Sequence, residues 1–131
     1  MSDRKPLDAL AVTHRRYVPY GHAHYGGGLV DGAYVLRLFG YVLTEASIRL
    51  DGDEGLIASY SEVQFKASVR AGDVVEARAT LTRIGNRSRS YALEAWVACR
   101  ANPDGGPSAA VVVEPPLTVA IAVATVVVPA S

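Results

Sequence analysis

The chain has 131 residues, half of them hydrophobic, and its acidic and basic side chains balance to a formal net charge of zero. That length favours a single domain over residues 1–131, with a sizeable core. A neutral chain without a stripe of basic and aromatic side chains argues against a nucleic-acid binder. The single cysteine, Cys99, excludes an intrachain disulfide and a cysteine cluster for a metal.

Neither end of the sequence predicts a membrane segment. The first residues, MSDRKPLDAL, are polar and carry no secretory signal, and we expect residues 1–8 to form a flexible tail. The apolar run over residues 111–128 is interrupted by Glu114, Pro115 and Pro116, and what remains is too short and too β-branched for a membrane helix. We therefore expect a cytoplasmic protein that does not bind a membrane.

The pattern along the chain predicts a strand, one long helix and four further strands. The first strand is expected over residues 9–18, where Pro19 ends it. A turn cluster, DGDEG at residues 51–55, ends the helix. The later strands are expected over residues 56–66, 74–84, 88–101 and 117–128, separated by turns at residues 71–73 and 85–86 and by the loop NPDGGPS at residues 102–108.

A histidine-bearing loop and three glycines, Gly26 to Gly28, open the long helix. Two lines of side chains lie nearly opposite each other along it. The first line contains Leu29, Leu36, Leu43 and Leu50, and the second contains Asp31, Val35, Leu38, Val42 and Glu45, flanked by Tyr34 and Tyr41. A helix that is apolar on both sides is expected to be surrounded, and the polar groups on the second side indicate a ligand site or a subunit interface.

A long helix with two apolar sides needs a sheet that curves around it. The expected architecture is therefore α+β, with a long central helix wrapped by a five-stranded antiparallel sheet, as in the hotdog fold. The segment SVRAGDVVEARATLTRIGNRS resembles the hotdog segment in which a Gly-Asp turn precedes a strand and a Gly-x-x-Ser turn follows it.

Several separated motifs narrow this resemblance. The segments RRYVPYGHAHYGGGLVDGA, LFG followed by TE, DGDEGL, AGD, IGNRS, EAW and EPP together resemble the acyl-CoA ammonia lyases of the hotdog superfamily, which include the 3-aminobutyryl-CoA and β-alanyl-CoA ammonia lyases. The resemblance covers nearly the whole chain from residue 14. It implies an acyl-CoA substrate, no metal and no cofactor other than the coenzyme A of the substrate, and reversible loss or addition of an amine at the β-carbon.

The sequence departs from the family pattern at three positions. Gly28 stands where the family has asparagine, Tyr41 where it has aspartate, and Gln64 where it has glutamate. A substrate ammonium needs carboxylates that pair with it and move protons, whereas glutamine cannot take a proton and a tyrosine phenol acts mainly as a hydrogen-bond donor. One hypothesis is that the β-group of the substrate is not a bare ammonium; the other is that the base has moved.

The candidate catalytic residues are His24, Asp31, Tyr41 and Glu45. His24 is a general acid or base by type, or a structural histidine. Asp31 orients a histidine or caps the helix. Tyr41 donates to the β-substituent, shapes the acyl pocket or packs against a partner helix, and Glu45 pairs with Tyr41, with an arginine or across an interface.

Backbone amides from Gly28 to Gly32 are expected at the helix N-terminus, where they can hold the thioester oxygen; the alternative is that the glycines only make a turn. The other candidate substrate-binding residues are His22, Tyr25, Gln64, Arg87 and Arg89, with the two arginines suited to the phosphates of coenzyme A or exposed to solvent.

Three functions stay open at this point. The preferred one is β-elimination of an amine or a related group from an acyl thioester, or the reverse addition. The second is an acyl-CoA thioesterase, and the third is a protein that binds or cyclises an acyl thioester without hydrolysing it. The thioester carrier is coenzyme A or an acyl carrier protein. The resemblance also implies a homodimer or a higher homo-oligomer with active sites between subunits.

Overall fold

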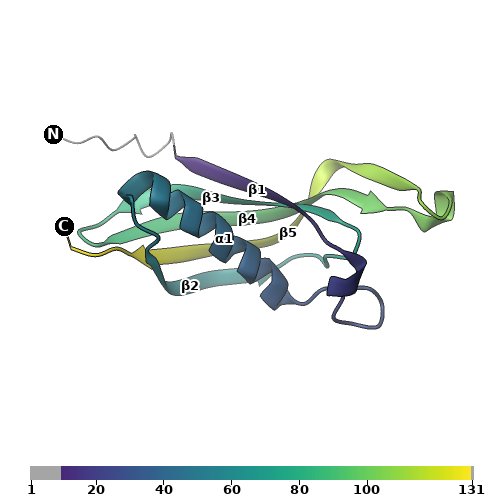
Figure 1. Ribbon diagram of the computed structural model, residues 1–131, viewed down its shortest axis with the longest axis horizontal. Helices are drawn as coiled ribbons and strands as arrows, with labels where there is room; N and C mark the ends of the chain where they lie inside the picture. Colours follow the sequence, from purple (N-terminus) through teal and green to yellow (C-terminus); the bar gives the residue numbers. More distant parts are fainter. Residues whose placement is uncertain (1–9, 131) are drawn as a thin grey trace.

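The computed structural model describes residues 10–130, and the tail expected at residues 1–8 lies outside this range. The described part forms one long helix and five strands (Figure 1). In chain order these are β1 (Ala11–Tyr17), the 3-10 turn η2 (Tyr20–His22), α1 (Gly32–Asp51), β2 (Leu56–Phe65), β3 (Val74–Ile84), β4 (Ser88–Ala101), the 3-10 turn η3 (Pro103–Gly105) and β5 (Ala110–Val127). No helix in residues 10–130 is long and apolar enough to cross a membrane.

The strands form one antiparallel sheet in the order β1-β3-β4-β5-β2, and α1 lies across one face of it (Figure 1). Alternation along β3 and β4 turns one row of small and branched side chains toward the helix, where they are buried, as at Ala77, Ala79, Leu93 and Ala95. The arrangement confirms the predicted hotdog architecture, and it leaves β1 and β2 as the two edges of the sheet.

One side of α1 is buried against the sheet and the other is open. The buried residues are Val35, Leu38, Phe39, Val42, Leu43, Ala46 and Ser47. The open side carries Ala33, Arg37, Tyr41 and Ile48, which are all exposed. Both lines predicted from the sequence contribute to this buried side, with Val35, Leu38 and Val42 from one line and Leu43 from the other. The sheet of one chain therefore covers both lines, and the open side, which contains no member of either line, is available to a ligand or to a second copy of the chain.

The last strand is longer than expected. Pro115 and Pro116 cannot donate to a sheet, which is why the sequence predicted a strand only from residue 117. In the structure β5 begins at Ala110, and a shift of register absorbs the prolines: Val97 pairs with Leu117, but Cys99 pairs with Val112. The first part of β5 and the end of β4 form a hairpin that projects beyond the rest of the sheet (Figure 1).

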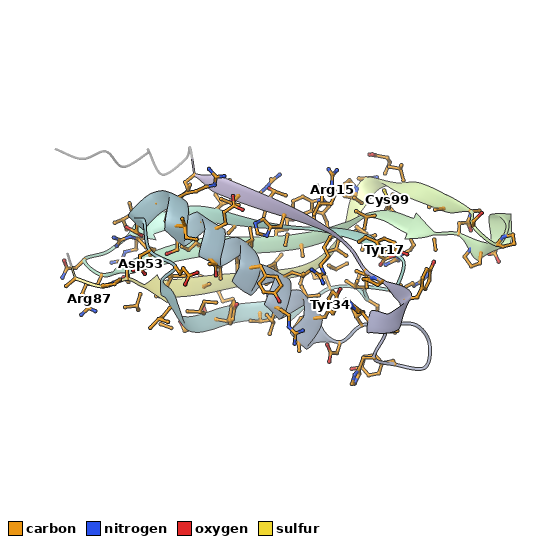
Figure 2. All side chains as sticks on the ribbon, viewed as in Figure 1. Arg15, Tyr17, Tyr34, Asp53, Arg87 and Cys99 are labelled. Atoms are coloured by element: carbon orange, nitrogen blue, oxygen red, sulfur yellow. The ribbon has the colours of Figure 1, made fainter. Side chains whose placement is uncertain are left out.

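Arg89 and Arg87 both lie at the C-terminal end of α1. The burial of Arg89 against Asp51 shows that its prediction as a phosphate ligand is wrong, whereas the same role for the exposed Arg87 stays a prediction. The Arg89 side chain is only 2% exposed; Nε and Nη2 donate to Asp51 at 3.0 and 2.9 Å, and Nη1 donates to the Gly85 and Ser88 carbonyls. Arg87 donates to the Val128 carbonyl. Figure 2 shows Arg87 at the left end of the molecule, far from Tyr34, which lies near the N-terminal end of α1. Sequence alone could not separate these roles because an arginine after a turn is usually exposed.

The pair of Asp51 and Arg89 joins the last residue of α1 to the turn between β3 and β4. Asp51→Ala removes the carboxylate, which is 8% exposed, and leaves the guanidinium buried without its counter-ion. We expect a loss of about 3–5 kcal/mol in the free energy of unfolding, measured by urea denaturation. Asp104→Ala, the same change at an exposed position, should cost far less. Equal losses in the two variants would contradict the structural role of the pair.

Glu45 ties α1 to β1 rather than standing beside the candidate base His24. Its Oε1 lies 2.8 Å from His14 Nε2, and its Oε2 accepts from Arg49 Nε at 2.7 Å. Arg49, and then His14, hold the pKa of the Glu45 carboxyl below its usual 4.5. The contact with Arg49 corresponds to the predicted pairing of Glu45 with an arginine.

A lowered pKa stabilises the folded chain above the usual pKa of glutamate, and this stability is lost as the pH falls through the folded-state pKa. Glu45→Gln should therefore flatten the acid side of the stability profile, measured by urea unfolding between about pH 6 and about pH 3. The effect should be small because the pair is partly exposed. Glu54→Gln, at an exposed site, should leave the slope unchanged, and an unchanged slope in Glu45→Gln would refute the assignment.

Candidate active site at the helix N-terminus

The loop before α1 ends in a tight turn that sets where the helix begins. The His24 and Tyr25 amides donate to the Leu29 carbonyl at 2.8 and 3.1 Å, and the Gly28 amide donates to the Tyr25 carbonyl at 3.0 Å. Gly28 has a φ of 80°, a left-handed conformation that favours glycine. The expectation that Gly28 offers its amide from the helix terminus is wrong, because α1 starts at Gly32 and the Gly28 amide is already used.

The first free amides belong to Gly32 and Ala33. Asp31 is the N-cap, and one of its oxygens accepts from the Tyr34 amide at 3.0 Å. The amides of Gly32 and Ala33 have no acceptor within residues 10–130. Unpaired N–H groups at a helix start, reinforced by the helix dipole, can hold an oxygen that becomes negative during a reaction.

Phe65 covers this helix start from the end of β2. Its ring carbon Cζ lies 2.8 Å from where a β-carbon on residue 32 would sit, so a larger residue at position 32 would displace the Phe65 ring from the helix start. Phe65 was not among the residues predicted from the sequence. Its position depends on the register of the edge strand β2 against β5, which places Phe65 opposite Ala120, and no local pattern reports that pairing.

His24 and Asp31 meet beside the free amides. His24 Nδ1 lies 3.9 Å from Asp31 Oδ2, with side-chain exposures of 60% and 36%. The Tyr25 ring stands edge-on to the His24 ring, with centroids 4.6 Å apart. The distance is longer than a hydrogen bond, as is common in sites without substrate. The structure confirms the predicted helix cap at Asp31, and its role toward His24, as an orienting group or a proton acceptor, stays a prediction.

The remaining candidates are distributed around this centre. Gln64 is exposed and precedes Phe65 on β2, so it belongs to the strand end that reaches Gly32. Tyr41 and Glu45 follow Gly32 along α1 by about 13 and about 20 Å at 1.5 Å per residue. Of the two positions that lost a carboxylate relative to the family pattern, only position 64 therefore lies at the helix start.

His22 and Tyr41 line a separate cavity, between α1 and the end of β1. The His22 ring contacts Tyr34 rather than His24: Nδ1 lies 2.9 Å from the Tyr34 hydroxyl. The two histidines of the loop, two positions apart in sequence, thus lie in different sites: His22 lines this cavity, and His24 lies beside the helix start. No group of three or more His, Cys, Asp or Glu in residues 10–130 is arranged to hold a metal ion.

Tyr91 is the most deeply buried phenol, and it lies under the far end of α1. Burial, and then the charge of Asp51, raise the pKa of Tyr91 to about 12. The phenol is therefore neutral at physiological pH and is not a proton carrier for the helix N-terminus.

Comparisons with known proteins identify the family and the fold of the chain. Residues 27–100 match the family model of the thioesterase superfamily. The chain is 50% identical over 107 residues to the 3-aminobutyryl-CoA ammonia lyase of Acetoanaerobium sticklandii, which covers 82% of this chain and 85% of that protein.

Solved structures extend the comparison. The β-alanyl-CoA:ammonia lyase from Clostridium propionicum superposes with a TM-score of 0.86 at 30% identity, covering 91% of this chain and 85% of that one. A hexameric hotdog fold thioesterase of Campylobacter jejuni gives a TM-score of 0.71 at 20% identity, covering 88% and 80%, and shows the fold alone. The chain belongs to the thioesterase superfamily of hotdog proteins and, within it, to the acyl-CoA ammonia lyase family that its sequence motifs resemble.

Proposed function

We propose that the protein catalyses the reversible loss of ammonia from a β-aminoacyl-CoA, giving an enoyl-CoA. One observation carries the proposal: free amides at the start of α1 stand beside a histidine that faces a carboxylate. The 50% identity to a 3-aminobutyryl-CoA ammonia lyase supports the same reaction. The coenzyme A belongs to the substrate, and the reaction needs no metal or other cofactor.

The reaction begins with the thioester oxygen at the amides of Gly32 and Ala33. His24 removes a proton from the α-carbon, and the electron pair moves into the carbonyl to give an enolate whose negative oxygen these amides stabilise. The pair then returns to form the double bond between the α- and β-carbons while the carbon–nitrogen bond breaks. The ammonium group leaves as ammonia and takes the proton from His24, so that enoyl-CoA and an ammonium ion are formed.

Asp31 positions His24 and adds the negative charge that an ammonium substrate needs. Gln64 offers the substrate amine a carbonyl oxygen but no second carboxylate. Phe65 shields the helix start from water on one side, which strengthens the hydrogen bonds to the developing enolate. The hypothesis that the leaving group is larger than ammonia stays a prediction, and it is tested by including an N-alkylated β-aminoacyl-CoA in the assay.

The purified protein should convert 3-aminobutyryl-CoA or β-alanyl-CoA to the enoyl-CoA with release of ammonia. His24→Gln should lower kcat by about 10²–10⁴-fold, because it removes the general base while keeping the shape of the loop. The matched control is His14→Gln, a histidine that pairs with Glu45 instead, and it should keep nearly full activity. Release of free thiol without ammonia would instead make the protein a thioesterase, and full activity in His24→Gln would refute the mechanism.

We infer that the active form is a homodimer or a higher homo-oligomer. Within residues 10–130, the edge strand β2 has no partner on its outer side and exposes Leu56, Ile57 and Phe65, so its backbone groups on that side are available to a second copy. Pairing of two β2 edges brings the exposed Phe65 and the helix start of one subunit to the subunit boundary. A cytoplasmic location fits a coenzyme A thioester as substrate.

Sedimentation equilibrium measures the mass of the assembly in solution. The mass at assay concentration should be at least twice the 13.9 kDa of one chain, because a second copy covers the exposed apolar edge of β2. A fully active species of 13.9 kDa would contradict the assembly.

A further inference from the structure

A second site lies beside the candidate active site. A cavity of about 260 Å³ is lined by Arg16, His22, Tyr34, Arg37, Leu38 and Tyr41. The Tyr34 hydroxyl accepts from Arg16 Nε at 3.2 Å and lies 2.9 Å from His22 Nδ1. These contacts hold three polar side chains together at the wall of the cavity. Figure 2 shows Tyr34 near the N-terminal end of α1.

The cavity carries positive charge that the described residues do not neutralise. Arg37 makes no recorded hydrogen bond or ion pair within residues 10–130, and Arg16 bonds only to a neutral hydroxyl. None of the lining residues is acidic. The carboxylates on neighbouring elements are engaged elsewhere: Asp31 caps the helix, Glu45 pairs with His14 and Arg49, and Glu76 pairs with Arg15 and Trp96.

We propose that this cavity binds a phosphate group of the carrier that bears the acyl thioester. The inference rests on the proposed function, since both coenzyme A and the phosphopantetheine of a carrier protein have phosphates. Guanidinium groups match the oxygens of a phosphate in charge and geometry, and His22 and Tyr41 add further polar groups. Pockets for whole small molecules usually measure ~300–1,000 Å³, so this one suits a phosphate group rather than a nucleotide.

Tyr41 lies on the wall of this cavity, about 13 Å along the helix axis from Gly32 of the same chain. The family that the sequence resembles has an aspartate at this position, and a carboxylate among Arg16 and Arg37 would cancel part of their charge and repel a phosphate. A tyrosine keeps the cavity positive and supplies a hydrogen-bond donor. The departure at position 41 therefore concerns the carrier end of the substrate.

The placement also suits a long substrate. Arg37 and Tyr41 lie about 7 and about 13 Å from Gly32 along the helix axis at 1.5 Å per residue. The pantetheine arm separates the phosphate from the thioester by a comparable or longer path. One loop provides His24 beside the helix start and His22 in the cavity, so a single segment contacts both ends of the bound arm.

The experiment measures equilibrium binding by calorimetry for coenzyme A, dephospho-coenzyme A, 4′-phosphopantetheine and pantetheine, using the intact protein. Arg37→Gln and Arg16→Gln should each weaken the binding of coenzyme A by about 10-fold or more, the effect of losing a charge-assisted hydrogen bond. Both should leave the affinity for pantetheine, which has no phosphate, unchanged. Arg83→Gln is the matched control, since Arg83 is exposed on β3 and away from the cavity.

The probes identify the phosphate. Equal sensitivity of 4′-phosphopantetheine and coenzyme A to Arg37→Gln assigns the phosphate next to the pantetheine, which both carriers share. Sensitivity of coenzyme A alone assigns a nucleotide phosphate and makes coenzyme A the carrier. Unchanged affinity for every phosphate-bearing probe overturns the proposal, and so does a change of oligomeric mass without a change of affinity, because the arginines then serve a contact between copies.

The two proposals fail separately. Phosphate-dependent binding that survives in a protein without lyase activity rejects the reaction and keeps the phosphate site. Lyase activity with wild-type Michaelis constants in Arg16→Gln and Arg37→Gln keeps the reaction and rejects the site.

Discussion

The start of α1 is the constraint on which the site depends. Asp31 ends the preceding loop and caps the helix, and this leaves the amides of Gly32 and Ala33 as the first donors without an acceptor. The cap also fixes the direction of the carboxylate, whose other oxygen faces His24. Asp31 thus stabilises the helix start and also lies beside His24 and the free amides. A change at Asp31 therefore acts on folding and chemistry together, which is why His24 is the cleaner position for a test.

The charged side chains of α1 are paired at its C-terminal end, which leaves the N-terminal end open to a ligand. The C-terminal end is closed by Asp51 bound to the buried Arg89, and Arg49 adds a cation in the last turn, where the helix dipole favours it. Glu45 is held by His14 and Arg49. The acidic groups of the second half of the helix are thus paired within the chain. Arg37, on the first half of the helix, and Arg16, on β1, have no acidic partner within residues 10–130, and both line the cavity proposed for a phosphate group.

The sequence predicted the fold well because the fold follows from periodicity. The period of the helix, the alternation in β3 and β4 and the turn residues between them are local, and each element lies within a few residues of its expected place. The prediction missed the early start of β5, because a register shift accommodates prolines in a way that composition does not reveal. The sequence prediction also began the helix before Gly32. A left-handed turn and a helix start both favour glycine, so the glycines alone do not tell one from the other.

Side-chain roles were harder to predict, because they depend on which distant segment lies opposite. Arg89 has the same local context as an exposed arginine, and only the position of Asp51 makes it a buried counter-ion. In the sequence, Phe65 is only an apolar residue of an edge strand. The register of that strand against β5 is what places the Phe65 ring on Gly32. The residues correctly brought together, His24, Tyr25, Asp31 and Gly32, are close in sequence. Arg16 and Arg37 come from different elements and were not singled out.

The spacing of His22 and His24 explains how one loop can serve two sites. The chain turns at η2 and again at the Tyr25–Leu29 turn, so the two rings leave the backbone on different sides and contact Tyr34 and Asp31 respectively. The short loop that carries both histidines therefore links the cavity lined by His22 to the helix start beside His24. In the two proposals above, this link lets contacts with a remote, unreactive part of the substrate position the reacting carbon.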